Sequence, residues 1–152
     1  MPLAIRDIAR NDRPQWQVLW DGYNAFYGRS GPTALDPAIS ELTWERFFDA
    51  AEPVHALVAV DGDRLVGLAH YLFHRSTTRA EDVCYLQDLF TLEALRGKGV
   101  GRKLIEAVVE AARRAGSSRV YWQTKSDNHA ARMLYDKLAK HSGFIVYVRE
   151  PI

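Results

Sequence analysis

The chain has 152 residues, of which 47% are hydrophobic and 26% charged, values typical of soluble globular proteins. This composition excludes a disordered tail, a coiled coil and a collagen-like fibre, and we expect one domain over residues 1–152. Lys and Arg number 20 and Asp and Glu 19, so the net charge of +1 indicates neither bulk nucleic-acid binding nor a membrane-surface protein. The single cysteine excludes an internal disulfide and a cysteine zinc cage.

The amino terminus carries charges at Arg6, Asp7 and Arg10 and lacks the apolar core of a signal peptide. No apolar run approaches the length of a membrane span. We therefore expect a cytoplasmic protein. The five histidines have no ligand spacing, so we expect no metal.

In chain order, the first half of the sequence predicts a short strand over 3–8 and then two helices. The first helix is capped at residues 11–12 and has aromatic residues at helical spacing. Residues 28–37 are rich in Gly and Pro and predict a loop. The second helix is expected from about Ser40 and is ended by Pro53.

The sequence then predicts a hairpin, because the turn signal Asp61-Gly62-Asp63 joins apolar runs over 54–60 and 65–74. The remaining predicted elements are a strand over 83–92, a helix over 99–115, a strand over 119–123, a helix over 128–140 and a last strand over 144–148. Hairpins followed by β-α-β units predict an α/β (α+β) fold with a mixed sheet and helices on both sides.

The most informative stretch joins a predicted strand to the long helix and has glycines at Gly97, Gly99 and Gly101. Glycines let the backbone approach a ligand closely, and the helix dipole adds partial positive charge. The interleaved basic residues are Arg96, Lys98 and Arg102. The pattern favours a pyrophosphate site over a turn that only allows tight packing, and its spacing fits neither a triphosphate loop nor a dinucleotide loop.

Residues 96–101 resemble the R/Q-x-x-G-x-G/A motif of the GNAT superfamily of acetyl-CoA-dependent N-acetyltransferases. Residues 85–90 resemble the strand before that motif, and Asn128 and Tyr135 fall where the family has an Asn and a Tyr. The resemblance covers 83–148 and is greatest to the polyamine and histone acetyltransferase branch. It implies a mainly antiparallel sheet in which a splayed strand pair holds acetyl-CoA.

The resemblance also implies which residues contact the cofactor. A β-bulge separates the strand around Leu89, Phe90 and Thr91 from its neighbour, and the pantetheine arm bonds to their backbone. The residues expected around the pyrophosphate are Arg96, Gly97, Lys98, Gly99, Val100, Gly101 and Arg102. Asn128 is expected to cap its helix, to bind the cofactor arm, or both.

In this family the acceptor amine attacks the thioester directly, so Cys84 is not needed for chemistry and is expected in the core. Tyr135 is the candidate general acid, because a phenol can donate a proton to the leaving thiolate. Polyamine-specific relatives have a carboxylate at the position of Gln87, and glutamine cannot take a proton. This leaves Asp88, a water chain or deprotonation of the amine by solvent.

The expected acceptor is a primary amine, either a small polyamine-like molecule or a lysine side chain. Its pocket is expected to include Tyr27, Trp44 and Gln87, whereas Trp16 and Trp20 are expected in the core. The candidate charged partners of the amine are Asp21, Asp36, Glu41 and Glu45. His70 or His74 is a further candidate to line the cleft.

Two other functions stay open at this point. A non-catalytic acyl-CoA sensor is favoured by the missing carboxylate at Gln87. A nucleic-acid-binding domain that uses the basic loop is disfavoured, because no aromatic platform accompanies the cluster. By analogy with the family we expect a homodimer, formed through the last strand at 144–148, whose edge would otherwise be exposed.

Overall fold

The computed structural model describes residues 3–152, and its five strands form one sheet in the order β1-β2-β3-β4-β5. Four strands pair antiparallel: β1 (Leu3–Asp7), β2 (Val54–Asp61), β3 (Arg64–His74) and β4 (Val83–Thr91). The last strand, β5 (Val120–Tyr121), runs parallel to β4. The sheet is therefore mixed and mainly antiparallel, as predicted.

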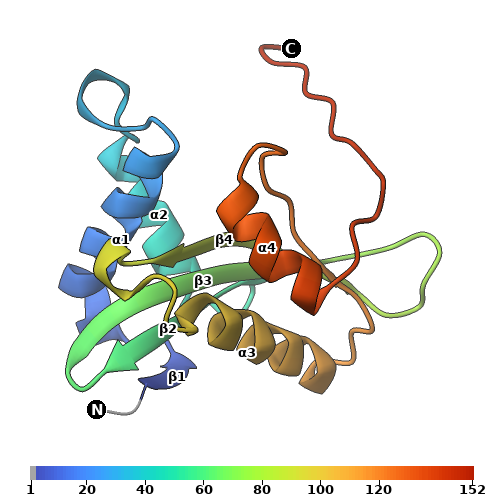
Figure 1. Ribbon diagram of the computed structural model, residues 1–152, viewed down its shortest axis with the longest axis horizontal. Helices are drawn as coiled ribbons and strands as arrows, with labels where there is room; N and C mark the ends of the chain where they lie inside the picture. Colours follow the sequence, from blue (N-terminus) through green and yellow to red (C-terminus); the bar gives the residue numbers. More distant parts are fainter. Residues whose placement is uncertain (1–2) are drawn as a thin grey trace.

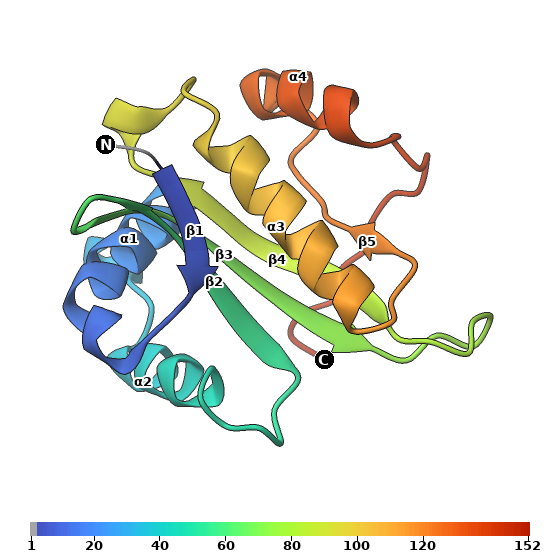
Figure 2. The ribbon, with the colours of Figure 1, turned by 90° about the horizontal axis from the view of Figure 1, so that it is seen from below.

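The helices are α1 (Arg13–Phe26), α2 (Pro37–Arg46), α3 (Val100–Arg114) and α4 (His129–Leu138), and short 3-10 turns occupy Arg10–Asp12, Gly31–Thr33 and Glu93–Leu95. Figure 2 shows α1 and α2 on one face of the sheet and α3 and α4 on the other. This arrangement confirms the predicted helices on both sides. Within residues 3–152, none of the helices is long and apolar enough to cross a membrane.

Several element boundaries differ from the predicted ones for local reasons. α2 begins at Pro37 rather than near Ser40, because the carboxylate of Asp36 accepts a hydrogen bond from the Ala38 N–H at 2.9 Å and caps the helix there. α2 then ends at Arg46, well before Pro53. β5 contains two residues instead of the five predicted, because the chain leaves β4 after Tyr121.

The last strand predicted, over 144–148, does not form in this single chain. Residues 139–152 adopt neither helix nor strand, and the side chains at 144–148 are 65% to 88% exposed. Figure 1 shows this segment extending away from the sheet after the end of α4. A strand-forming sequence needs an edge to pair with and a surface to pack on. Within residues 3–152, this segment has neither of them beside it. The prediction of a strand is wrong for the isolated chain.

The sheet separates two buried clusters of side chains. On one face Leu104, Ile105 and other residues of α3 pack on the strands, and on the other face Trp16 and Trp20 of α1 are buried as expected. Gly67 of β3 lies under the start of α3. A Cβ there would come within 3.0 Å of Val100 Cγ1 and 3.1 Å of Leu104 Cδ1, so the glycine lets the first turn of α3 lie directly on the sheet.

An ion pair connects β1 to the beginning of α1. The Arg6 guanidinium donates two hydrogen bonds to the carboxylate of Asp12, at 2.7 and 2.9 Å, and the Ala9 N–H donates a third at 2.8 Å. Asp12 is buried. Its position before α1 predicts that its side chain caps the helix, but the side chain forms no such hydrogen bond. The hydrogen bond from Arg6 is the main cause that lowers the pKa of Asp12.

Replacing Asp12 by Asn is expected to destabilise the protein in a pH-dependent way. Because the folded-state pKa of Asp12 is lowered, its contribution is complete above the unfolded pKa of about 3.9 and is lost as the pH falls through the folded value. We expect Asp12→Asn to lower the free energy of unfolding by about 1–2 kcal/mol at pH 7, with a smaller loss at pH 3. Urea unfolding at both pH values measures this, and the exposed Asp136→Asn is the control. A difference between wild type and Asp12→Asn that grows at pH 3 would contradict the assignment.

Candidate active site

β4 has one paired edge and one edge that is largely free. It pairs with β3 along its whole length but, within residues 3–152, with β5 at only two positions, Cys84 with Val120 and Tyr85 with Tyr121. Beyond these pairs the two strands part, so within residues 3–152 no strand pairs with this edge of β4 at Leu89, Phe90 and Thr91, although the Thr91 carbonyl accepts a hydrogen bond from Arg96. An edge with unpaired N–H and C=O groups accepts an extended ligand as an additional strand.

The bulge in this strand lies earlier than the family resemblance implied. In the β3–β4 register His70 pairs with Asp88 and Tyr71 with Leu86, so Gln87 is the extra residue. The expected position near Leu89 to Thr91 is regularly paired with β3. A bulge bends its strand and redirects the side chains beside it. Here it places Gln87 at the surface while Asp88 is buried.

The glycine loop follows β4 and leads into α3. Gly97 and Gly99 have φ angles of +77° and +83°, which favour glycine, and Gly99 is the N-cap of α3. The N–H groups of the first helical turn have no acceptor within the helix, and they point toward the loop. The structure therefore brings the predicted Gly97–Arg102 stretch to a helix N-terminus beside the free end of β4.

The basic side chains of the loop have different partners. Arg96 donates from Nε to the Thr91 carbonyl at 3.2 Å, and its guanidinium lies 5.6 Å from the centre of the Phe90 ring. Arg102 forms an exposed ion pair with Glu106 at 3.1 Å. Arg96 therefore fixes the loop to the strand. Because Arg96 and Arg102 have partners within the chain, the groups left to face an anion at the start of α3 are mainly backbone N–H groups.

Asp88 is the buried end of a chain of polar side chains. His70 Nδ1 lies 2.9 Å from Asp88 Oδ2, and Trp16 Nε1 donates to His70 Nε2 at 3.1 Å. An indole can only donate, so His70 Nε2 accepts and the proton of the neutral imidazole is on Nδ1, from which it is donated to Asp88. His70 is 3% exposed and Asp88 9%. The expectation that His70 or His74 lines the cleft therefore applies to His70, because His74 is exposed and bonds to the Tyr121 hydroxyl.

A cavity of about 450 Å³ opens above Asp88, between the strands and helices α1 and α2. Its polar lining consists of Asn24, Arg29, Thr43, Arg46, Gln87 and Asp88, together with His70. Arg29 is held by a 2.6 Å hydrogen bond from its Nε to Asn24 Oδ1, and Arg46 lies 3.8 Å from Glu52. Two guanidinium groups and one carboxylate therefore line the same cavity.

The other predicted acidic partners do not line this cavity. Glu41 pairs with Arg13 and Glu45 with Arg10, each at 2.9 Å, and Asp36 caps α2. Glu41 and Glu45 therefore connect α2 to α1 and to the turn before it, while Asp36 caps the start of α2. The sequence therefore predicted a negative acceptor pocket, whereas the structure gives a pocket with two arginines that sequence reasoning missed.

Among the predicted acceptor residues, Gln87 lines the cavity and Tyr27 is half-buried beside it. Trp44 is 3% exposed and lies among the other aromatic residues, with its ring centre 5.1 Å from that of Trp16. Trp44 is thus buried in the aromatic cluster and outside the cavity lining, so the structure does not bring it together with Gln87 as the sequence predicts. Tyr27 lies 5.0 Å from the ring of Tyr23, whose pKa is raised by burial and by the charge of Asp88.

Tyr135 projects from α4 on the other side of the opening between β4 and β5. Its ring packs edge-on against Trp122 at 5.6 Å, and burial, followed by the proximity of Tyr27, raises the pKa of its phenol. The phenol is therefore protonated throughout the neutral range. Asn128 caps α4 by accepting from the Ala131 N–H at 3.5 Å, which confirms the cap.

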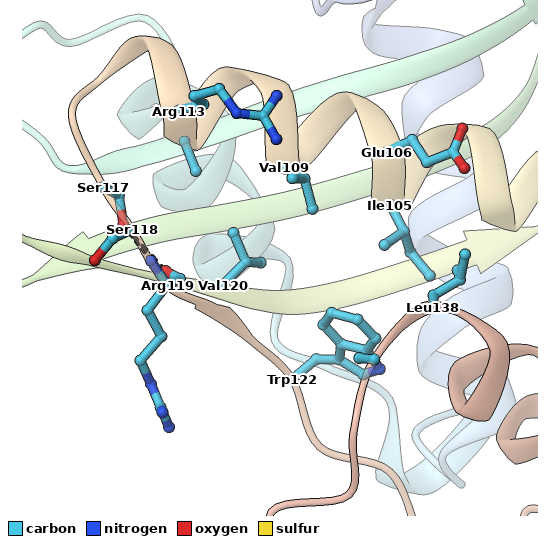
Figure 3. A pocket seen from close by; sticks show the side chains of 12 residues that line it. Ile105, Glu106, Val109, Arg113, Ser117, Ser118, Arg119, Val120, Trp122 and Leu138 are labelled. Atoms are coloured by element: carbon cyan, nitrogen blue, oxygen red, sulfur yellow. Dashed lines mark hydrogen bonds between the residues drawn. The ribbon is translucent and has the colours of Figure 1, made fainter.

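Cys84 has no part in this arrangement. It is fully buried in β4, and burial raises the pKa of its thiol to about 12, which confirms its expected place in the core. A second hollow, of about 590 Å³, lies on the far side of β5, between α3 and the end of α4 (Figure 3). None of the residues predicted to bind cofactor or acceptor lines it.

Comparison with known proteins agrees with this geometry. The model of the Acetyltransferase (GNAT) family matches residues 16–139. The chain is 37% identical over 150 residues to the D-amino-acid N-acetyltransferase HPA3 of Saccharomyces cerevisiae, which covers 97% of this chain and 90% of that relative. It is 34% identical over 85 residues to the thialysine N-epsilon-acetyltransferase of Mus musculus, covering 56% of this chain and 49% of the relative.

Solved structures share the fold at lower identity. AAC(6')-Iy in complex with the bisubstrate analog CoA-S-monomethyl-acetylneamine has a TM-score of 0.82, with 17% identity and 100% of both chains covered. An aminoglycoside acetyltransferase from an uncultured soil metagenomic sample has a TM-score of 0.79, with 21% identity, 97% of this chain and 95% of that chain covered. The family match over most of the chain and the similarity to HPA3 show that this protein belongs to the GNAT family of acetyltransferases.

Proposed function

We propose that the protein transfers an acetyl group from acetyl-CoA to the primary amine of a small molecule. The observation that carries this proposal is the place of β4 between two sites. The strand has a free edge beside a glycine loop at a helix N-terminus, and its buried Asp88 lies at the floor of a separate polar cavity. A cofactor and an acceptor can therefore meet at one strand.

The residues around the free edge fit acetyl-CoA. The backbone of Leu89, Phe90 and Thr91 would bond to the pantetheine arm, and the N–H groups from Gly97 to Arg102 would hold the pyrophosphate. Positive φ at Gly97 and Gly99 turns the loop without side chains that would shield these groups. When bound, acetyl-CoA supplies an acetyl group activated as a thioester.

Asp88 and Tyr135 would handle the two protons of the reaction. An alkylammonium with a pKa of about 10.4 must lose a proton before it can attack, which costs about 4–5 kcal/mol at pH 7. Asp88 can accept this proton, because His70 holds its carboxylate in a fixed orientation at the cavity floor. Tyr135, protonated at neutral pH, would donate to the thiolate that leaves. Gln87 would bind the acceptor through its amide.

The cavity favours an acceptor that carries a carboxylate as well as an amine. Arg29 and Arg46 bring two positive charges to the lining, and Asp88 brings one negative charge. A polyamine would place several positive charges beside the two guanidinium groups, which is unfavourable. An amino acid instead offers its carboxylate to the arginines and its amine to Asp88. The similarity to HPA3, a D-amino-acid N-acetyltransferase, supports this acceptor class.

A non-catalytic acyl-CoA sensor is the second candidate, favoured by Gln87 in place of a carboxylate. Asp88 argues against it, because a buried carboxylate beside the cavity supplies the missing proton acceptor. Release of free CoA thiol during incubation with acetyl-CoA and an amino acid separates the two functions. A sensor binds acetyl-CoA but releases no thiol.

Gly99→Ala is expected to weaken the binding of acetyl-CoA by about tenfold. The φ of +83° at Gly99 is strained for alanine by about 1–2 kcal/mol, and relief of that strain rotates the loop amides. Gly116→Ala is the matched control, because Gly116 has a similar φ of +87° beyond the opposite end of α3, where an added Cβ would meet no atom within 4 Å. Calorimetry measures both affinities. Absence of binding to the wild-type protein at millimolar acetyl-CoA would overturn the cofactor assignment.

Tyr135→Phe is expected to lower kcat by about 10²-fold while leaving the affinity for acetyl-CoA nearly unchanged. Loss of the hydroxyl removes the proton donor but keeps the ring packed against Trp122. Because its pKa is raised, wild-type kcat should show no loss from ionisation of Tyr135 below about pH 10. Tyr121→Phe, which removes a hydroxyl bonded to His74, is the control. Unchanged turnover in Tyr135→Phe would exclude it as the acid.

Arg46→Gln is expected to raise KM for amino acids by about tenfold or more, because it removes one charged partner of the carboxylate. The same variant should leave KM unchanged for the matching amine that lacks a carboxylate, for example phenethylamine against D- and L-phenylalanine. Arg10→Gln, an exposed arginine paired with Glu45, is the control. A wild-type enzyme that prefers a polyamine to every amino acid would contradict this acceptor class.

A further inference from the structure

Asn24 is a buried amide of α1 in the lining of the cavity above Asp88, and it is 4% exposed. Asparagine is a weak helix former, and burial of its amide is unfavourable unless the polar atoms are bonded. Here both are bonded, because Nδ2 donates to the Trp20 carbonyl at 2.9 Å and Oδ1 accepts from Arg29 Nε at 2.6 Å. A carbonyl can only accept and a guanidinium can only donate, so these two partners determine the orientation of the amide.

The end of α1 brings Arg29 beside Asn24. Gly28 has a φ of +80°, and its N–H donates to the Ala25 carbonyl at 3.0 Å. The Arg29 N–H donates to the Asn24 carbonyl at 2.8 Å. These two hydrogen bonds form a Schellman motif, which ends a helix and places the residue after the glycine beside the last turn. Asn24 therefore holds Arg29 twice, by its backbone carbonyl and by its side chain.

Two aromatic rings also hold the guanidinium of Arg29. Its Cζ lies 5.9 Å from the centre of the Tyr23 ring and 5.7 Å from that of Tyr27, within the range of a cation–π interaction. Within residues 3–152, Nε is the only atom of this guanidinium that has a hydrogen bond. The two Nη groups are left for a ligand, and their fork geometry fits a carboxylate.

Arg46, the other arginine of the cavity, is held less firmly. Its side chain is exposed, and its Nε lies 3.8 Å from Glu52, whose carboxylate offsets part of its charge. Ordering a long exposed side chain on a ligand costs conformational entropy. For Arg29 the folded chain has already met much of this cost, because Asn24 and the two tyrosine rings fix its guanidinium before a ligand arrives.

We infer that Asn24 is a positioning residue, which holds Arg29 so that its two Nη groups bind the carboxylate of the acceptor, and that Arg29 contributes more to this binding than Arg46. The inference rests on the proposed function for the acceptor class, an amino acid. Asn24 acts on the carboxylate through Arg29. The effect of replacing Asn24 must therefore disappear when Arg29 has already been replaced.

A double-mutant cycle on ligand binding tests this inference. N-acetylphenylalanine, in both enantiomers, carries the carboxylate of an expected product, and N-acetylphenethylamine lacks it. By calorimetry we expect Arg29→Gln to weaken binding of the acid by about a hundredfold, more than Arg46→Gln does, and Asn24→Leu to weaken it by about tenfold. In the Arg29→Gln background, Asn24→Leu should have no further effect. Binding of N-acetylphenethylamine should stay unchanged in all of these variants.

Ser40→Ala is the control for altered packing, because it removes another buried hydrogen bond, from Trp20 Nε1, without touching Arg29. It should leave both affinities unchanged. Circular dichroism checks folding, and Asn24→Ala, which removes the same amide, replaces Asn24→Leu if the larger side chain does not fit. An equal loss of affinity for both ligands, or a loss from Asn24→Leu that persists in the Arg29→Gln background, would overturn the inference.

The same measurements separate this inference from the proposed function. Absence of thiol release by the wild-type protein with every amine would overturn the proposed function, whereas calorimetry with the acid reports on Asn24 and Arg29 without turnover. A wild-type protein that releases thiol but binds N-acetylphenylalanine no more tightly than N-acetylphenethylamine would overturn the inference alone.

Discussion

The early parting of β4 from β5 is the constraint on which the candidate site depends. The strand is bonded to β3 along one edge, so its position is fixed, while in the part of the chain that the structure describes, residues 3–152, the other edge is paired at only Cys84 and Tyr85. A strand held on one side and open on the other can bind an extended ligand without rearranging. The same strand also carries Asp88 to the cavity between the sheet and helices α1 and α2, so under the proposed function one rigid element would set the relative positions of cofactor and acceptor.

The two faces of the sheet contribute different parts of the site. α3 and α4 provide the glycine loop and Tyr135, whereas α1, α2 and the loop between them provide Arg29 and Arg46. The buried polar chain from Asp88 through His70 to Trp16 connects the cavity floor to the aromatic cluster under α1. The cavity is therefore anchored in the aromatic cluster under α1, whereas Arg29 and Arg46, which select the acceptor under the proposed function, lie in its polar lining.

Features set by local chemistry could be predicted from the sequence. The hairpin at Gly62 and the loop at Gly99 require backbone conformations that favour glycine, and both form where expected. Partners that are distant in sequence could not be predicted. Trp16 bonds to His70, 54 residues away in the sequence. Glu41 and Glu45 of α2, which were candidate partners of the acceptor amine, instead form ion pairs with Arg13 and Arg10. Helical spacing marks Trp44 as apolar but does not tell which side of α2 faces the core. The apolar run over 144–148 predicts a strand. A strand also needs a surface to pack on, and this single chain places none beneath the segment within residues 3–152.

The hydrogen bond from Trp16 to His70 has a consequence for the route of the proton. The indole donates to Nε2 of the imidazole, and Nδ1 carries the proton donated to Asp88, so His70 offers no acceptor for a proton that arrives at Asp88. Under the proposed mechanism this proton would leave through the mouth of the cavity that Asp88 lines, as would the acetylated product. Each turnover would then reset the carboxylate only after the cavity has emptied.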